Sequence, residues 1–395
     1  MGDRFSGSIV TAAIIAAAAS AVISVSVTRT SAQAPAVSGA AQKTPWGEPD
    51  LQGIWTDEFD TPLQRPAKYA TQEFFTEAQR AELDKERSAV LTRFATEKDI
   101  NGAYNAATFF TTKRTGARTS KIVDPPNGRT PPLTPAAQKM AAAEREFRLA
   151  LLQSSDTCKK NLPGCAGGKY DPTPTPRYGE APPRYNTARM NRNDGPEESS
   201  LPERCLTGGL PEFGGATGSF RRIVQTPGGI SMFYDVGQGQ GWQRNIVMDG
   251  SPHLPASIRQ WYGDSRGHWE GNTLVVDVTN FSPKTDVFGS RENLHLVERW
   301  TRTGPRTLAY EVTIEDPTVW TRPWTVKQEF GRQRDEENRL YTEPRCLEGN
   351  FGLPGLLHGR RAEDLAFAEG RGPHPGTKDN TGALIDAEVP QDPLQ

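Results

Sequence analysis

The sequence has few of the residues that usually mark a catalytic or metal-binding protein. Among its 395 residues are 5 histidines and 4 cysteines. No CxxC pair is present, and no two histidines have metal-ligand spacing within one predicted element. GxSxG, HExxH, the Walker phosphate loop and GxGxxG before a helix are missing too. We therefore expect neither a metal nor an organic cofactor, and these motif-defined enzyme classes are excluded.

The chain also lacks an excess of charge of either sign. It carries 46 basic and 48 acidic residues, with a net charge of −2. Binding to nucleic acid needs a basic face or stripe, and none is visible. A nucleic-acid partner is therefore not expected.

Hydrophobic residues are scarce, at 35% of the chain, against roughly 45–50% in ordinary globular domains when glycine is counted. The 38 glycines and 32 prolines indicate much non-regular structure between the helices and strands. The length still allows a sizeable core, in one large domain or two.

The longest apolar run covers residues 8–27. The sequence Ala32-Gln33-Ala34 follows it and is typical of a signal-peptidase site. We predict a signal peptide at residues 1–34, a periplasmic or secreted protein, and no stable membrane association after cleavage. An uncleaved anchor is the alternative, because the run is close to the roughly 20 residues that cross a bilayer.

All four cysteines lie beyond this segment: Cys158, Cys165, Cys205 and Cys346. An even number in an exported protein indicates disulfides, and three pairings are possible. Cys158 and Cys165 flank a short loop, which makes a local bridge plausible and would leave Cys205 to pair with Cys346.

From residue 219 onward, short runs of alternating apolar and polar residues recur roughly every ten to fifteen residues, without a helix between them. The clearest is GHWEGNTLVVDVTNF at residues 267–281. Its Gly271-Asn272 fits a two-residue hairpin turn, so His268, Trp269 and Glu270 need no catalytic role. About nine such runs predict an antiparallel β-barrel or sandwich.

The expected organisation follows from these patterns. A helix- and loop-rich region at residues 35–200 would pack on a β-barrel or sandwich at residues 201–360, and residues 361–395 would form a flexible tail. Helices are expected at residues 72–97 and 134–153, the second with Thr134 as N-cap and Pro135 in its first turn. The fold class is thus mainly β with peripheral α.

One strand puts a charged residue on an apolar face. In LHLVERW, Glu298 shares a face with leucines and Trp300, while His295 lies on the other face. A buried carboxylate needs a partner, so an interior ion pair, for instance with an arginine, is one interpretation. The other is an acid–base role, in a site that would include His295, His253 and Asp264 if the fold gathers them.

Six of the chain's 8 tryptophans fall in the β-rich region. Core packing is the simplest interpretation. An aromatic-lined pocket for a flat organic ligand is the alternative, with these candidate ligand-binding residues: Trp261, Trp300, Tyr310 and Trp324.

Several segments resemble a large family of exported bacterial proteins. They include PWGEPDLQGIWT, KIVDPPNGRTPPLTPAA, DGSPHLPASIRQWYGDSRGHWEGNTLVVDVTNFS and TIEDPTVWTRPW, and the likeness runs in order from about Pro45 to Gly359. It implies no particular activity, cofactor or catalytic residue. The C-terminal strands are also similar to lipocalin-type barrels, whose Gly-x-Trp start GIW matches, although GIW lies far ahead of the strand series here. This second likeness implies fold only.

Two functions fit these observations, and a purely structural envelope protein is a third. One is an exported, cofactor-independent lyase, isomerase or hydrolase acting on a small organic molecule, which requires an acid–base pair in a pocket. The other is a non-catalytic lipocalin-like carrier for an apolar small molecule, which requires only an apolar cavity with a few polar anchors.

Overall fold

The structure is a computed structural model. It describes residues 42–96, 113–185, 195–198, 204, 209–213, 220–235, 241–334 and 352–378. The predicted signal peptide, the predicted Cys205–Cys346 disulfide and the last predicted strand, RLYTEPRC, lie outside the described residues.

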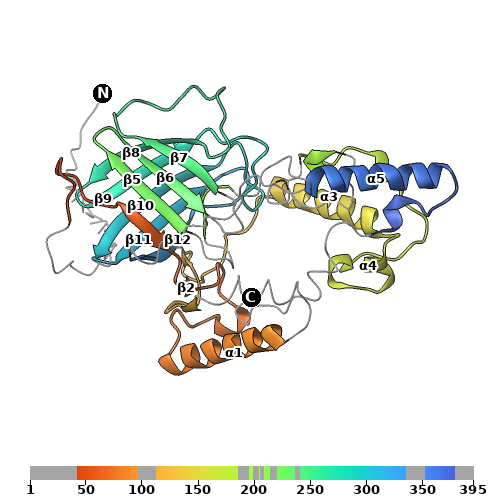
Figure 1. The fold of residues 1–395 in the computed structure, drawn as a ribbon, viewed down its shortest axis with the longest axis horizontal. Helices are drawn as coiled ribbons and strands as arrows, with labels where there is room; N and C mark the ends of the chain where they lie inside the picture. The colour runs from red at the N-terminus through yellow and green to blue at the C-terminus, as the bar shows by residue number, and fades with distance from the viewer. Residues whose placement is uncertain are drawn as a thin grey trace, which may run out of the picture. The chain divides into compact units, whose positions relative to one another are not determined.

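Nine strands close into a barrel (Figure 1). Their order around the ring is β1 (Gly53–Thr56), β5 (Phe220–Thr226), β6 (Gly229–Asp235), β7 (Gly241–Val247), β8 (Asp264–Glu270), β9 (Thr273–Thr279), β10 (His295–Gly304), β11 (Thr307–Glu315) and β12 (Trp324–Arg332). Pairing of β1 with β12 closes the ring. Neighbours are antiparallel except β7 and β8, which are parallel. The predicted mainly β fold is confirmed, as a barrel.

The barrel is built by the two-residue periodicity of its strands. Along β10, buried and partly exposed residues alternate from His295 to Arg302, so one row of side chains points into the core. The β8–β9 hairpin turns at Gly271, whose φ of 60° is the left-handed conformation such turns require. The hairpin predicted at residues 267–281 is confirmed.

Two strand assignments differ from the prediction. The barrel takes β1 from the N-terminal region, so residues 201–360 do not contain all of it. The predicted strand at residues 258–264 is a turn-rich segment instead, and β8 begins only at Asp264. Gly263 explains this, because its φ is +66° and a Cβ there would lie 2.6 Å from the Thr279 carbonyl oxygen.

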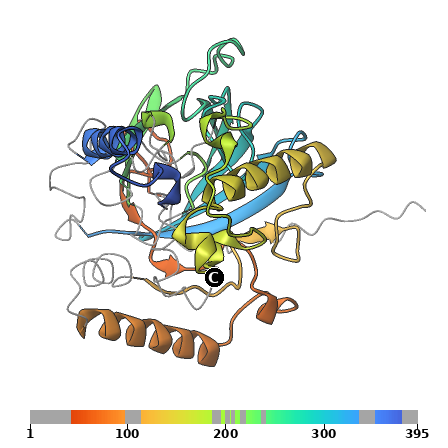
Figure 2. The same ribbon diagram turned by 90° about the vertical axis from the view of Figure 1, so that its right-hand side faces the viewer.

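The helices lie outside the strand series: α1 (Glu77–Thr96), α3 (Pro135–Leu152), α4 (Asp156–Lys159) and α5 (Gly352–Ala368) (Figure 2). The Thr134 side chain accepts a hydrogen bond from the Ala137 amide, which confirms the predicted N-cap. Because α5 continues past residue 360, residues 361–368 of the predicted tail are helical. None of the described helices has an apolar stretch sufficient to span a membrane.

Shorter elements complete the described chain. They are the strands β2 (Phe59–Asp60), β3 (Arg114–Thr115) and β4 (Ile122–Asp124), and the 3-10 helices η1 (Ala67–Tyr69), η2 (Pro163–Cys165), η3 (Pro176–Gly179), η4 (Pro196–Glu198) and η5 (Pro375–Thr377). The predicted local disulfide, Cys158–Cys165, is present and joins α4 to η2.

Candidate functional site

The predicted acid–base residues lie on two sides of one barrel wall. His295 and Glu298 are three residues apart on β10, so they face opposite sides of the sheet. His253, Asp264 and His295 come together on the outer side, whereas Glu298 points into the barrel. The fold therefore gathers three of the four residues and separates the fourth.

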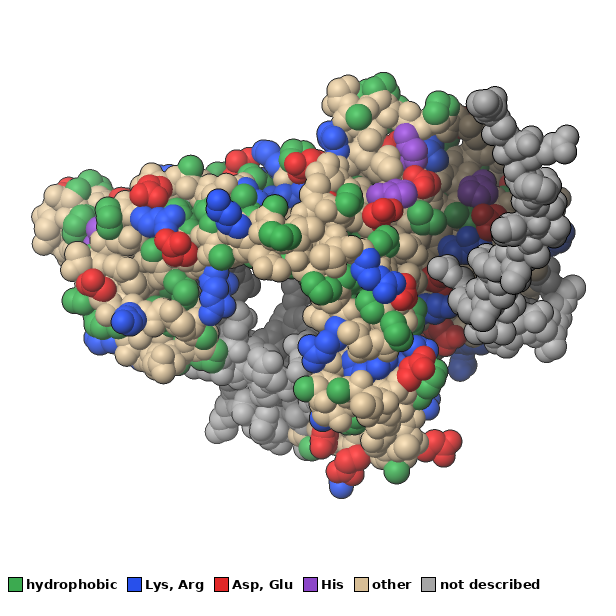
Figure 3. Space-filling model, turned by 180° about the vertical axis from the view of Figure 1, so that it is seen from behind, with side chains coloured by type: hydrophobic (Ala, Val, Ile, Leu, Met, Phe, Trp, Pro, Cys, Tyr) green, Lys and Arg blue, Asp and Glu red, His purple; other side chains and the backbone are tan. Residues whose placement is uncertain are grey.

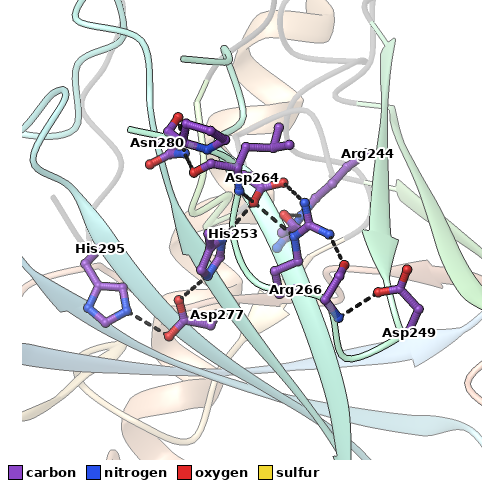
Figure 4. Close-up of polar contacts among 12 residues, drawn as sticks. Arg244, Asp249, His253, Asp264, Arg266, Asp277, Asn280 and His295 are labelled. Atoms are coloured by element: carbon purple, nitrogen blue, oxygen red, sulfur yellow. Dashed lines mark hydrogen bonds and ion pairs between the residues drawn. The ribbon is translucent and has the colours of Figure 1, made fainter. Parts of the chain in front are cut away.

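The outer histidine cluster consists of His253, Asp264, Asp277 and His295 (Figure 4). Nδ1 of His253 lies 2.8 Å from Asp264, and its Nε2 lies 2.8 Å from Asp277. The second Asp277 oxygen lies 2.9 Å from Nε2 of His295. Asp277, on β9, thus joins the two histidines. It was missed from the sequence, although its place on the polar face of TLVVDVT is the signal that could have revealed it.

Hydrogen bonds within this cluster stabilise the charged forms of its side chains. The hydrogen bond with Asp277 raises the pKa of His295 above its ordinary value, and the same bond lowers the pKa of Asp277. Burial alone would raise the pKa of Asp264, but hydrogen bonds from Arg266, the Leu254 amide and His253 keep it lowered. The two aspartates are therefore held as carboxylates.

This arrangement attaches a loop to three strands of the barrel. Both ring nitrogens of His253 lie against carboxylates, so neither is available as a base without breaking a contact. On the face seen in Figure 3, histidines lie beside acidic and basic side chains. Within the described ranges, no group of three or more His, Cys, Asp or Glu residues could hold a metal ion. The cluster ties residues 249–262 to β8, β9 and β10.

The inner polar cluster is centred on Glu298. Its Oε2 accepts a hydrogen bond from Arg244, on β7, and its Oε1 accepts one from the Tyr310 hydroxyl at 2.8 Å. Arg244 also donates to Ser265 at 2.9 Å and to the Tyr234 hydroxyl at 3.4 Å. Glu298 thus forms an interior ion pair with an arginine, which was one of its two interpretations from the sequence.

Burial fixes the protonation of the groups around Glu298. Burial and the adjacent negative charge raise the pKa of Tyr310 well above its ordinary value, so Tyr310 remains a phenol that donates to the carboxylate. Burial also raises the pKa of Tyr234. For Arg244, burial lowers the pKa, but the charge of Glu298 outweighs this and the net shift is upward. The cluster is a satisfied ion pair with two phenolic partners.

Aromatic rings line the same interior. The rings of Trp300 and Tyr310 lie 4.2 Å apart, and Phe330 lies about equally far from both, at 6.1 and 6.2 Å. A second stack joins Tyr234, Trp242 and Tyr262, with spacings of 4.9 and 5.3 Å. Two of the predicted ligand-binding residues, Trp300 and Tyr310, are therefore neighbours inside the barrel.

Of the other two predicted ligand-binding residues, Trp324 belongs to the same barrel core and Trp261 does not. Trp324 is fully buried and packs with Trp320 at 5.4 Å and Phe288 at 6.1 Å. Trp261 is 38% exposed, at the surface, in the turn before β8. Its neighbour Tyr262 packs against the core instead.

Several inward-facing side chains hold polar atoms without a partner. Among the described residues, no hydrogen-bond partner is present for either amide atom of Gln328, for Nε1 of Trp300, or for Nε and Nη1 of Arg221. We call Arg221, Trp300 and Gln328 the inner donor set. Trp300, Tyr310 and Gln328 are directly opposite one another across β10, β11 and β12. Buried polar groups in proteins nearly always have a partner.

The sequence contains a signal for the two members that were missed. Gln328 alternates with Val326 and Phe330 on one face of β12, and Arg221 alternates with Ile223 on β5. This is the same pattern, a polar residue on an apolar face, that pointed to Glu298.

A surface cleft of about 440 Å³ lies apart from both clusters. Ala137 and Met140 of α3 form one wall, and Phe288 and Val319 form another. Its volume falls within the roughly 300–1,000 Å³ of small-molecule sites. It is therefore the alternative to the barrel interior as a binding site for a small molecule.

Two solved structures align with part of the chain. A secretary abundant heat soluble (SAHS) protein from Ramazzottius varieornatus is 12% identical, with a TM-score of 0.22, over 34% of this chain and 82% of that one. A mutant of the fluorescent protein UnaG is 16% identical, with a TM-score of 0.21, over 32% and 79%. No protein-family model and no curated protein matches the chain. The resemblance to exported bacterial proteins therefore stays a prediction.

Proposed function

We propose that the protein binds a small organic molecule inside its barrel, as a non-catalytic carrier or binding protein. The observation that carries this proposal is Gln328, which is only 7% exposed and has no partner for its amide oxygen or nitrogen among the described residues. An exported location remains part of the proposal.

Among the described residues, the buried amide of Gln328 has no hydrogen bond to offset its removal from water in the free protein. A buried polar group without a partner destabilises the fold by roughly 1–3 kcal/mol, and an apolar side chain of similar size would fill the same space without that penalty. A ligand with one hydrogen-bond acceptor and a flat body would satisfy the amide N–H and pack on the rings of Trp300 and Tyr310. The barrel interior thus combines an aromatic surface with polar anchors.

The acid–base enzyme has less support. Both oxygens of Glu298 accept hydrogen bonds from buried partners, and His253 is held between two carboxylates. Neither can move a proton to or from a substrate without giving up a contact.

Binding of Prodan, a neutral naphthyl ketone whose emission depends on its surroundings, tests the proposal. We expect a saturable blue shift with the wild-type protein. Gln328→Leu should weaken binding about three- to tenfold, the effect of one lost hydrogen bond, while raising the melting temperature. Glu329→Gln, on the exposed outer face of the same strand, is the matched control and should change neither.

Two results would count against the proposal. The proposal fails if neither Prodan nor the anionic probe 1-anilinonaphthalene-8-sulfonate binds saturably. Binding that is unchanged in Gln328→Leu but lost in Met140→Glu would move the site to the cleft beside α3.

A further inference from the structure

We propose that the ligand of the barrel carries an acidic group, a carboxylate or a similar oxyanion on a flat apolar body, and that Arg221 receives this group. The inference rests on the proposed function and adds the charge of the ligand to it.

Arg221 is a buried guanidinium with unused donors. It is on the inner face of β5 and is fully buried, at 0% exposed. Its Nη2 donates to the carboxylate and the backbone oxygen of Glu212. Its Nε and Nη1 have no partner in the described part of the chain. Each unpartnered nitrogen carries part of the guanidinium charge, so an oxyanion is an acceptor that it would bind strongly.

The position of Arg221 connects it to the aromatic interior. Its guanidinium carbon lies 3.9 Å from the centre of the Phe330 ring and 5.6 Å from that of Tyr234. Phe330 is two residues from Gln328 on the same inner face of β12, and its ring contacts those of Trp300 and Tyr310. An acid bound at Arg221 would therefore extend its body toward Gln328 and the rings.

Two further buried cations share the carboxylate of Asp57 near Arg221. The ammonium groups of Lys113 and Lys121 lie 3.0 and 3.8 Å from the same oxygen of Asp57, and all three side chains are buried. Arg221 is close enough to help lower the pKa of this Asp57. Burial lowers the pKa of Lys121, although the carboxylates of Asp57, Glu212 and Asp60 act against this shift. A bound oxyanion would lie close to these cations.

The unpartnered atoms are mostly donors. In the inner donor set, Arg221 offers two nitrogens, Trp300 one and Gln328 one, against a single acceptor, the amide oxygen of Gln328. The indole nitrogens of Trp242, Trp269 and Trp324 are unpartnered too within the described residues. A ligand rich in acceptors fits this excess, and a ligand rich in donors does not.

Two fluorescent probes that differ by one group test the inference. They are 1-anilinonaphthalene-8-sulfonate, an anion, and N-phenyl-1-naphthylamine, its neutral counterpart. We expect the anion to bind the wild-type protein at least tenfold more tightly. Arg221→Met should weaken the anion tenfold or more and change the neutral probe less than twofold. Arg222→Met, on the exposed outer face of β5, should leave both affinities unchanged.

The outcomes separate the two proposals. Equal binding of both probes to the wild type, or anion binding that Arg221→Met does not weaken, overturns the anion inference and leaves the binding function standing. If neither probe binds the wild-type protein, both proposals fail.

A measurement on the wild type alone covers the case in which Arg221→Met does not fold. Naphthalene-2-carboxylate and 2-naphthylmethanol would be compared as competitors of bound Prodan. The carboxylate should displace the probe at a concentration at least tenfold lower. Equal potency of the acid and the alcohol would refute an acid-binding Arg221.

Discussion

At the scale of single residues, the ion pair between Arg244 and Glu298 is the most consequential interaction of the interior. Both side chains are almost fully buried, and water can replace neither partner. Removing one partner of such a pair leaves an uncompensated buried charge, whereas replacing both by apolar residues is often neutral or stabilising. The pair therefore constrains substitution more than it stabilises the fold.

Glu298→Gln should lower the free energy of unfolding by about 3–5 kcal/mol, because Arg244 loses its counter-ion. Glu311→Gln removes a partly exposed carboxylate paired with Lys327 on the outer face and should change it by less than about 1 kcal/mol. Denaturant unfolding followed by tryptophan fluorescence would give both values. A Glu298→Gln protein as stable as the wild type would show that this carboxylate is held at a cost, as a functional acid would be.

At the scale of elements, the outer histidine cluster holds the loop at residues 249–262 against the strands. Asn280 adds a second attachment, because its side-chain amide donates to the Leu254 carbonyl at 2.8 Å. The loop is thus attached by side chains, and its stability depends on their protonation.

The loop should be held most firmly in mildly acidic solution, because protonated His295 holds Asp277, which in turn holds His253 of the loop. The pKa of His295 is raised above 6.5, so its contribution is complete below that pH and is lost as pH rises through the raised value. The pKa of Asp277 is lowered from 3.8, so its contribution is present above that pH and is lost as pH falls through the lowered value. The contact between His295 and Asp277 is therefore strongest between pH 3.8 and pH 6.5, the ordinary pKa values of the two groups.

Hydrogen exchange would measure this effect. After correction for intrinsic rates, amides of residues 249–262 should exchange several-fold faster at pH 8.5 than at pH 5.5. Asp277→Asn should abolish the difference, and Glu292→Gln, an exposed acid outside the cluster, should preserve it. Equal protection at both pH values in the wild type would contradict the expected role of His295.

Local patterns predicted the elements well because alternation and turn residues act over a few positions. The β8–β9 hairpin, the cap at Thr134 and the inward direction of Glu298 were all of this kind. Partners were harder to predict. Arg244, which neutralises Glu298, is 54 residues away in sequence, and the closure of the ring by β1 depends on pairings that no local pattern encodes. Asp277 was missed because its role exists only once two histidines from other segments meet it.

At the scale of the whole molecule, the described chain has more than one hydrophobic core. The barrel core is one cluster, while Leu152, Cys158 and Cys165 form another and Phe147, Leu151 and Tyr178 a third. The residues around the disulfide are therefore not part of the barrel interior.

Replacing Cys158 and Cys165 by serine should leave the barrel intact. Closing so short a loop is worth about 2–3 kcal/mol in the chain-entropy model, and the loss should fall on the α4–η2 segment. We expect unchanged near-ultraviolet circular dichroism and Prodan affinity, with faster exchange confined to residues near 154–166. Loss of the barrel signal in the double variant would show that the cores are coupled.

The closure of the ring by β1 and β12 has a consequence for how the chain reaches its fold. Thr56 and Gly331 are hydrogen bonded although they are 275 residues apart in sequence. During synthesis β1 leaves the ribosome before every other strand of the barrel, and one of its two neighbours is the last of those strands to be made. Until then, both edges of the growing sheet are open to pairing with other chains. Because contacts so distant in sequence form slowly, ring closure should be a late step and the stage at which a chaperone matters most.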